Sequence, residues 1–356
     1  MEEVRKEFLS FHECKKKGWH LIKIPAYDIE NIPKECLKMA VREQIVPTDT
    51  AYSSVLLQDI LNQLQKRYPW MELMSIGNSV MGSPIWALSI GEGSVEVFYN
   101  ASFHANEWIT TPVLLRFAEE FLEAADQGKR IYGVDADWLY RTFRLYLVPM
   151  VNPDGVDLVN EKIDHTKLNP DGIPYYDQAQ AIAAGYPRIP FPSGWKANIN
   201  GVDLNLQFPA GWEEAKKIKS ELGFTSFAPR DFPGDGPLTE PEGLAVYRFT
   251  RQHDFHLILA YHTQGEVIYW RYLDYEPPGS RRIARYFSEV SGYEVAETPR
   301  ESGYAGYKDW FIQDYNRPGY TIEAGRGENP LPVTQFEEIY DANIGILIGG
   351  MVQLLV

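Results

Sequence analysis

Two histidines and one glutamate lie where the sequence could hold a metal ion. His104 and Glu107 are three residues apart after the apolar run VEVFYNASF, so a single turn can present both side chains to one ion. His262 follows the apolar run HLILAY, at the point where the polar residues TQGE begin. Two imidazoles and one carboxylate form the three-ligand set of a catalytic zinc site, which leaves a position for a water molecule whose pKa falls to about 7. These residues are therefore the candidate ligands of one zinc ion per chain.

Glu323 ends a further apolar run, YTIE, and is the candidate general base. A carboxylate between Ile322 and Ala324 could take a proton from a zinc-bound water and pass it to the leaving amine. The alternative for Glu323 is a solvated acid next to Arg326. The alternative for His104 and His262 is a hydrogen-bonded core or surface role, which is the more common one for a histidine taken singly. The joint occurrence of all four residues favours the catalytic interpretation.

The residues between these sites predict how they are positioned. From about residue 46 onward, short apolar runs rich in β-branched and aromatic residues alternate with helical patterns such as TTPVLLRFAEEFLEAA. That alternation predicts an α/β domain with a largely buried, twisted sheet, in which functional groups usually lie at the carboxyl ends of strands. Thr111 before Pro112 predicts a helix start, because threonine can cap free amides and proline fits the first helical position.

Two other segments differ from this alternating pattern. Residues 1–45 are rich in lysine and glutamate and have weak periodicity, so we expect a short appendage of unknown role before a catalytic domain at 46–356. Between Asn160 and Pro241 the chain is rich in proline, glycine and aromatic residues, and long irregular segments in compact domains are usually functional. We expect this second segment to build the substrate cleft.

The composition of the chain disfavours two classes of binding partner, nucleic acids and membranes. The chain has 356 residues and a formal net charge of −15, with acidic and basic residues interspersed, so attraction to nucleic acid or to an anionic membrane surface is disfavoured. The amino terminus lacks the apolar run of a secretion signal, and no stretch reaches the ~18 apolar residues of a membrane span. We therefore expect a cytoplasmic protein with neither a nucleic-acid nor a membrane partner. The sequence leaves the oligomeric state open.

Five short motifs carry a family resemblance. The motifs FHANEW, NPDGV, GVDLN, AYHTQG and YTIE occur in the order and at distances typical of the zinc metallocarboxypeptidases, which the chain resembles from about residue 46 to the end. The resemblance implies an α/β/α sandwich around a mixed, mostly parallel twisted sheet. It also implies that His104, Glu107 and His262 bind zinc and that Glu323 is the general base.

The resemblance implies roles for further residues. Asp203 matches a carboxylate that orients the first zinc histidine from behind. Lys196, after Trp195, stands where the family has an arginine that stabilises the oxyanion, and a lysine can supply that charge without the bidentate fork. A tyrosine of the family also lines the active site, and here Tyr304 is the first candidate, with Tyr307 behind it.

One position departs from the exopeptidases of the family. Their Asn-Arg pair grips the terminal carboxylate of the substrate, whereas this chain has Asn205 and Leu206. Loss of charge-assisted hydrogen bonds worth ~1.5–3 kcal/mol each makes ordinary removal of a carboxy-terminal amino acid unexpected. Among the matched positions, Leu206 therefore points to a different substrate.

The chain also resembles the γ-D-glutamyl-meso-diaminopimelate peptidases of spore-forming bacteria. The resemblance lies in three longer stretches, NASFHANEWITTP, WKANINGVDLNLQFPAGWE and TIEAGRGENP. That resemblance implies zinc-dependent cleavage of peptidoglycan stem peptides or muropeptides, either in the recycling of released muropeptides or inside a sporulating cell. The cations Arg326 and Lys308 would then read the carboxylates of D-glutamate and diaminopimelate. The preferred stem length and the choice between endo- and exo-action are left open.

Three alternatives stand beside this interpretation. One is a conventional zinc carboxypeptidase that recruits Arg326 or Arg271 for the terminal carboxylate, which Leu206 disfavours. A second is a non-catalytic muropeptide-binding protein, which the presence of Glu323 disfavours. The third is an amidohydrolase of small acylated amino acids, which the length of the cleft-building segment disfavours.

Overall fold

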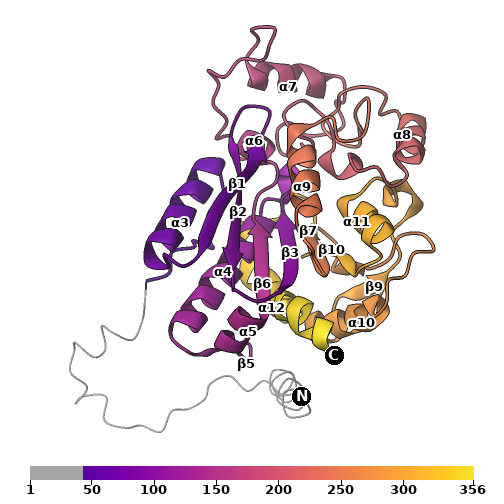
Figure 1. The fold of residues 1–356 in the computed structure, drawn as a ribbon. Helices are drawn as coiled ribbons and strands as arrows, with labels where there is room; N and C mark the ends of the chain where they lie inside the picture. The colour runs from indigo at the N-terminus through magenta and orange to yellow at the C-terminus, as the bar shows by residue number, and fades with distance from the viewer. Residues whose placement is uncertain (1–42) are drawn as a thin grey trace.

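The computed structural model of the chain describes residues 43–356, so the predicted appendage at 1–45 lies almost wholly outside the described residues. An eight-stranded sheet runs through the middle of the described part (Figure 1). Its strand order is β1-β2-β6-β3-β7-β10-β8-β9, and the strands β6, β3, β7 and β10 at its centre are parallel to one another. In this order the strands span Glu72–Asn78, Pro84–Ile90, Phe143–Val148, Val95–Ala101, Leu257–His262, Gly319–Glu323, Val267–Tyr269 and Glu294–Ala296.

Helices cover both faces of the sheet. One face packs against α3 (Ser54–Arg67), α4 (Thr110–Asp126), α5 (Ala136–Thr142), α10 (Ser280–Ser291) and α12 (Phe336–Val352). The other face packs against α9 (Pro241–Arg251) and α11 (Tyr307–Tyr315), which Figure 1 shows on the opposite side of the strands from α3 and α4. The predicted α/β/α sandwich around a mixed, mostly parallel sheet is therefore confirmed.

The remaining elements are short or lie in the connections. Helices α6 (Pro153–Val159), α7 (Tyr175–Ala184) and α8 (Trp212–Glu221) follow β6, and β4 (Arg130–Ile131) pairs with β5 (Val134–Asp135) in a separate ribbon. The 3₁₀ turns are η2 (Ala105–Glu107), η3 (Leu204–Leu206), η4 (Arg300–Ser302), η5 (Val333–Gln335) and η6 (Gln353–Leu355).

The central strands are buried on both faces, which explains their apolar runs. In β3, Val97 and Tyr99 enter the core on the α4 and α12 side, whereas Phe98 enters the core on the α9 and α11 side. Strands that are covered on both faces read as continuous hydrophobic stretches rather than as alternating ones.

The predicted helix after the first motif is present, but its predicted cap is wrong. Helix α4 begins at Thr110, and the hydroxyl of Thr111 donates to the carbonyl of Pro149 at 2.7 Å. No side chain caps the helix, because the preceding turn η2 leads almost directly into it. Thr111 therefore fastens α4 to the end of β6.

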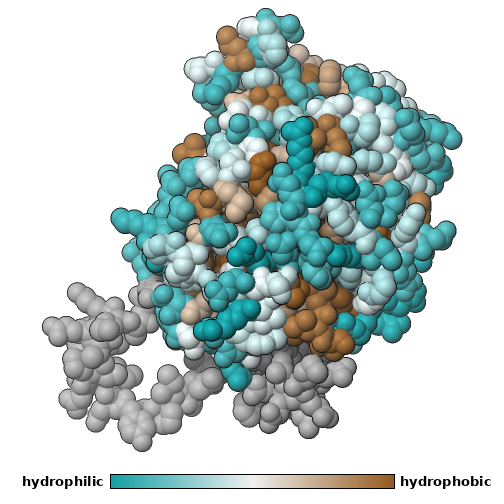
Figure 2. Space-filling view, in the orientation of Figure 1, coloured by the Kyte–Doolittle hydropathy of each residue, from teal (hydrophilic) through white to brown (hydrophobic). Residues whose placement is uncertain are grey.

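Figure 2 shows one face of the molecule, on which hydrophilic side chains predominate and apolar ones form small groups. One such group lies near the end of the chain, where Leu355 and Val356 are exposed. Among residues 43–356, no helix is both long enough and apolar enough to cross a membrane.

Candidate metal centre and active site

Three neighbouring parallel strands bring the chemistry to one edge of the sheet. Strand β7 lies between β3 and β10, and Glu323 is paired directly with His262 in the register of β10 and β7. His104 and Glu107 follow β3 on the short turn η2. Because parallel strands end at the same edge, residues more than 200 positions apart in the chain meet there.

The three candidate ligands converge on one point. His104 Nδ1 lies 3.0 Å from Glu107 Oε1, His262 Nδ1 lies 2.9 Å from Glu107 Oε2, and the two Nδ1 atoms are 3.2 Å apart. A tetrahedral zinc ion with bonds of about 2.0 Å places its ligand atoms about 3.3 Å from one another. The spacing of these atoms therefore fits a single zinc ion.

The charges around this point also suit a cation. Burial opposes protonation of His104, but the carboxylates of Glu107 and Asp203 overcome that effect and raise its pKa to about 9. Burial by itself would raise the pKa of Glu107, yet the nearby charges of His104 and Lys196 hold that pKa well below its usual range. Positive charge is thus stabilised between the ligands, and a divalent ion would supply it.

Glu107 is held in place by groups from three other segments. The amide of Thr263 donates to its Oε2 at 3.2 Å, and Lys196 Nζ lies 2.8 Å from its Oε1. Asn329 Nδ2 lies 3.5 Å from the same Oε1 and donates to the carbonyl of Thr263 at 3.0 Å. Asn329 lies in a loop after β10, within the stretch TIEAGRGENP, but no role was predicted for it from the sequence.

Asp203 lies behind His104 and fixes its ring. Its Oδ1 is 3.0 Å from His104 Nε2, and its two oxygens also accept the amides of Asn205 and Asp231, each at 3.1 Å. Burial would raise the pKa of Asp203, but its neighbours, His104 foremost, lower it. The ionised carboxylate keeps the His104 proton on Nε2. The lone pair of Nδ1 therefore faces the metal point, which is the position where the ligand atoms of His104, Glu107 and His262 converge.

Glu323 faces the same cavity as the ligands. Burial raises its pKa, and the nearby carboxylate of Glu107 adds to that effect, while His262 and Lys196 oppose it. A raised pKa brings a carboxylate closer to the value that a general base needs near neutral pH.

The NPDGV motif joins the turn that bears the ligands to the turn that bears Lys196. Asn152 Nδ2 donates to the carbonyl of Phe103 at 3.2 Å and to that of Ala197 at 2.9 Å. A Cβ on Gly155 would lie 2.8 Å from the Cβ of Ala105, so this position needs glycine for the close approach of α6 to η2. The motif therefore has a positioning function.

The irregular segment at 160–241 builds part of the cavity of about 150 Å³ beside the metal point, and residues 298–323 build a similar part. That segment supplies Lys196, Asp203, Asn205, Leu206, Lys219, Arg230 and Asp231 to its lining. Tyr269, Lys308 and Asp309 line it from the other segments. Arg230, Lys219, Asp231 and Tyr269 were not expected from the sequence, because none of them belongs to a recognisable motif.

Comparison with known proteins agrees with this geometry. A family model described as zinc carboxypeptidase, of the peptidase M14 family, matches residues 57–344. The chain belongs to this family. It is 46% identical over 299 residues to gamma-D-glutamyl-L-diamino acid endopeptidase 1 of Lysinibacillus sphaericus, covering 84% of this chain and 71% of that protein. It is 40% identical over 314 residues to an uncharacterized protein of Bacillus subtilis, covering 87% and 80%. With the family shown and the ligand triad assembled, the expected zinc cofactor is confirmed.

Solved structures show the same fold at low identity. Thrombin-activatable fibrinolysis inhibitor superposes with a TM-score of 0.65 at 17% identity, covering 88% of this chain and 78% of that one. Carboxypeptidase A from Helicoverpa armigera gives a TM-score of 0.65 at 19% identity, covering 91% and 81%.

Neither of the two tyrosines proposed for the active site is among the residues that line the cavity. Tyr304 packs with Leu206 and Trp212 and is not among the residues that line the cavity. Tyr307 is fully buried, and its hydroxyl lies 2.9 Å from that of Thr250. The tyrosine that does line the cavity is Tyr269, on β8.

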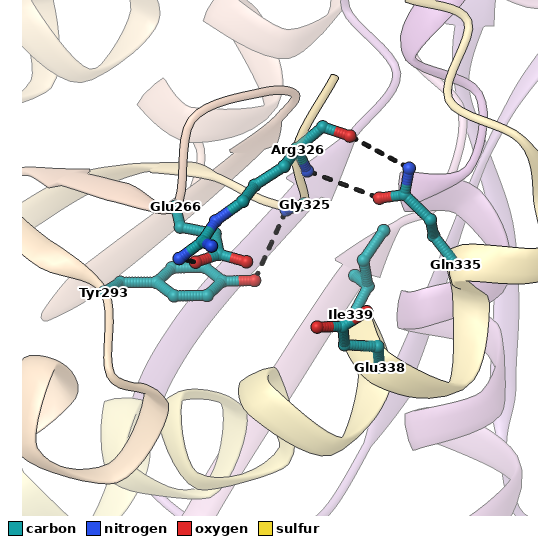
Figure 3. Close-up of a pocket in the computed structure, with 7 residues that line it drawn as sticks. All are labelled: Glu266, Tyr293, Gly325, Arg326, Gln335, Glu338 and Ile339. Carbon is teal, nitrogen blue, oxygen red and sulfur yellow. Dashed lines mark hydrogen bonds and ion pairs between the residues drawn. The ribbon is translucent and has the colours of Figure 1, made fainter. Parts of the chain in front are cut away.

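The arginines suggested as recruits for a terminal carboxylate also lie outside the cavity. Arg326 lines a separate pocket of about 270 Å³, where it pairs with Glu266 and its backbone contacts Gln335 (Figure 3). Arg271 pairs with Glu297 at 2.8 Å. Sequence proximity to the motifs put both near the site, but Arg326 comes after Gly325, where the chain has already turned away from the metal point with a φ of 71°.

Proposed function

We propose that this zinc peptidase hydrolyses the amide between the γ-carboxyl of D-glutamate and the amino group of meso-diaminopimelate in peptidoglycan stem peptides. The observation that carries the proposal is the 46% identity to gamma-D-glutamyl-L-diamino acid endopeptidase 1 over 84% of the chain. An alignment that covers 84% of the chain includes the segment at 160–241, which lines part of the cavity.

The environment of Leu206 supports a substrate other than an ordinary carboxy terminus. Its side chain is buried in a small apolar cluster with Trp212, Ala215 and Ala305, next to the cavity. An aliphatic side chain offers no donor to a carboxylate, so the grip expected of a conventional carboxypeptidase is missing at this position. The neighbouring Asn205 is also engaged, because its side-chain oxygen accepts the amide of Tyr307 at 3.1 Å.

The residues of the site divide the reaction between them. His104, Glu107 and His262 would hold a zinc ion, which when bound would lower the pKa of a water molecule and polarise the scissile carbonyl. Glu323 takes the proton of the attacking water and delivers it to the nitrogen of diaminopimelate as the amide breaks. Asp203 keeps the ring of His104 oriented throughout.

Lys196 supplies positive charge for the carbonyl oxygen. One of its three N–H groups faces Glu107 Oε1 at 2.8 Å, which leaves two for the negative charge that develops on the oxygen. Its pKa is raised: burial alone would lower it, but Glu107 outweighs that effect, so the ammonium stays charged. A fixed charge in a buried site stabilises such a transition state more than it would in water.

The test is a digest analysed by mass spectrometry. The purified zinc-loaded protein is incubated with L-alanyl-γ-D-glutamyl-meso-diaminopimelate, with an all-L peptide of equal length and with an ordinary carboxypeptidase substrate. Release of diaminopimelate from the first peptide at the highest rate is expected. Faster cleavage of either ordinary substrate would overturn the substrate assignment. The cytoplasmic location and the role in sporulating cells stay predictions from the sequence.

A further inference from the structure

Arg230 is a cation of the cavity that no motif predicted. It lies in the irregular segment before α9 and lines the same cavity as His104, Glu107 and Glu323. The carbonyl of Pro229, next to it, accepts the amides of Lys196 at 2.8 Å and Ala197 at 2.9 Å. Arg230 is therefore attached to the turn that bears the proposed oxyanion cation.

The guanidinium is held on one side only. Its Nε donates to Asp231 Oδ2 at 2.5 Å, and the other oxygen of Asp231 accepts Lys219 Nζ at the same distance. The two terminal nitrogens of Arg230 make no hydrogen bond within residues 43–356. One edge of the guanidinium is thus fixed, while the edge that can grip a carboxylate with two parallel hydrogen bonds is free.

A continuous series of hydrogen bonds links this cation to the metal centre. The amide of Asp231 donates to Asp203 Oδ2 at 3.1 Å, and Asp203 Oδ1 lies 3.0 Å from His104 Nε2. The backbone beside Arg230 is therefore bonded to the same carboxylate that orients a metal ligand.

Arg230 is also the most exposed of the cations that line the cavity in the described part of the chain. Its side chain is 42% exposed, against 16% for Lys196, 6% for Lys219 and 4% for Lys308. Each of these lysines faces a carboxylate with its single charged nitrogen, and Lys308 also donates to the carbonyl of Arg271 at 2.7 Å. A substrate can reach Arg230 more easily than any of them.

We propose that Arg230 binds a carboxylate of the substrate through its two terminal nitrogens and so supplies the recognition that Leu206 cannot. The inference rests on the proposed function and deepens it. A γ-D-glutamyl-diaminopimelate peptide carries a free α-carboxylate on its glutamate and further carboxylates on its diaminopimelate, whereas an internal α-peptide bond has none beside it. Arg230 therefore selects for the branched acidic substrate.

The experiment compares three substrates with the zinc-loaded full chain. They are L-alanyl-γ-D-glutamyl-meso-diaminopimelate, an analogue whose glutamate α-carboxyl is amidated, and an analogue whose diaminopimelate carboxyls are amidated. The variants are Arg230→Gln, Arg230→Lys and the control Arg141→Gln, which removes a surface arginine paired with Asp137. Zinc content and Tm are measured for each.

Arg230→Gln is expected to lower kcat/KM for the unmodified peptide about 10–100-fold, mainly through KM, as loss of a charge-assisted contact does. The same variant should have little effect on the analogue that lacks the carboxylate Arg230 binds, and this identifies the carboxylate. The kcat/KM of Arg230→Lys should lie between those of the wild type and Arg230→Gln, because lysine keeps the positive charge but cannot form two parallel hydrogen bonds to a carboxylate. Arg141→Gln should match the wild type.

If Arg230→Gln lowers kcat/KM equally for all three substrates, or for none of them, the assignment of Arg230 is overturned. The proposed function would still stand in that case, provided that the wild type cleaves the unmodified peptide. Failure of the wild type to cleave that peptide would overturn the proposed function itself, and the assignment of Arg230 with it. The two failures are therefore distinguishable.

Discussion

Replacement of Asp203 by asparagine tests how the metal centre is held. The carboxylate accepts three N–H groups, from His104 Nε2 and from the amides of Asn205 and Asp231. Asparagine has one acceptor oxygen and one donor NH₂ group, so in either orientation of the amide a donor faces a donor. The substitution keeps the volume of the side chain and changes its charge and its hydrogen bonding.

The expected magnitude follows from these contacts. The bond to His104 is charge-assisted and buried, and such bonds contribute about 1.5–3 kcal/mol. Loss of a carboxylate that orients a ligating histidine typically weakens metal binding about 10–100-fold. Asp203→Asn should therefore raise the dissociation constant for zinc by that factor and lower kcat/KM even at saturating zinc, because the ring of His104 is no longer fixed.

The measurement is competition for zinc against a colorimetric chelator, followed by kinetics with zinc in excess. Asp137→Asn is the matched control, since this acid forms an exposed ion pair with Arg141 away from the cavity. Zinc affinity of Asp203→Asn equal to that of the control would refute the reasoning, because it would mean that other contacts orient His104.

Three further predictions can be checked with the same protein. Glu323→Gln should lower kcat about 10²–10⁴-fold with zinc content unchanged, since a general base is not a ligand; near-normal turnover would remove Glu323 from the mechanism. Leu206→Arg should raise cleavage of ordinary carboxy termini, measured against the same peptides with amidated ends, and no gain would mean that the shape of the cavity excludes them. Burial raises the pKa of Glu242 from 4.5 to about 8, so its contribution to stability is present below pH 4.5 and is lost as the pH rises through about 8. The Tm of Glu242→Gln, which mimics the protonated acid, should fall less over this range than that of the wild type, and parallel Tm curves would contradict the assignment.

The parts of the site that lie at strand ends could be predicted from the sequence. His262 and Glu323 each end a run of apolar residues, and a polar residue that ends a buried parallel strand lies at the edge of the sheet where ligands bind. The strand pairing that sets them side by side follows from the parallel arrangement of β7 and β10.

Residues outside motifs could not be predicted in the same way. Arg230 lies in an aperiodic segment, where neither hydrophobic pattern nor turn chemistry indicates which side chains point inward. Tyr304 and Tyr269 show the same difficulty, because spacing along the chain does not determine the direction of a ring. Thr111 was assigned as a cap from local preference, yet its tertiary contact with Pro149 decides its role.

The zinc ligands and Glu323 lie at or just after strand ends, whereas the proposed specificity residues lie in the irregular segment, together with Lys196. The zinc ligands and Glu323 are fixed by the register of three buried strands and the turn after one of them, where a shift of one residue would turn side chains away from the cavity. Leu206 and Arg230 lie on a connection between sheet strands, where substitution changes the cavity lining but leaves the sheet intact. Asp203 joins the two parts, since its carboxylate bonds both His104 and the amide of Asp231. If Leu206 and Arg230 set the substrate as proposed, substitutions in the irregular segment should change specificity without loss of the metal centre, provided that Asp203 and Lys196 are kept.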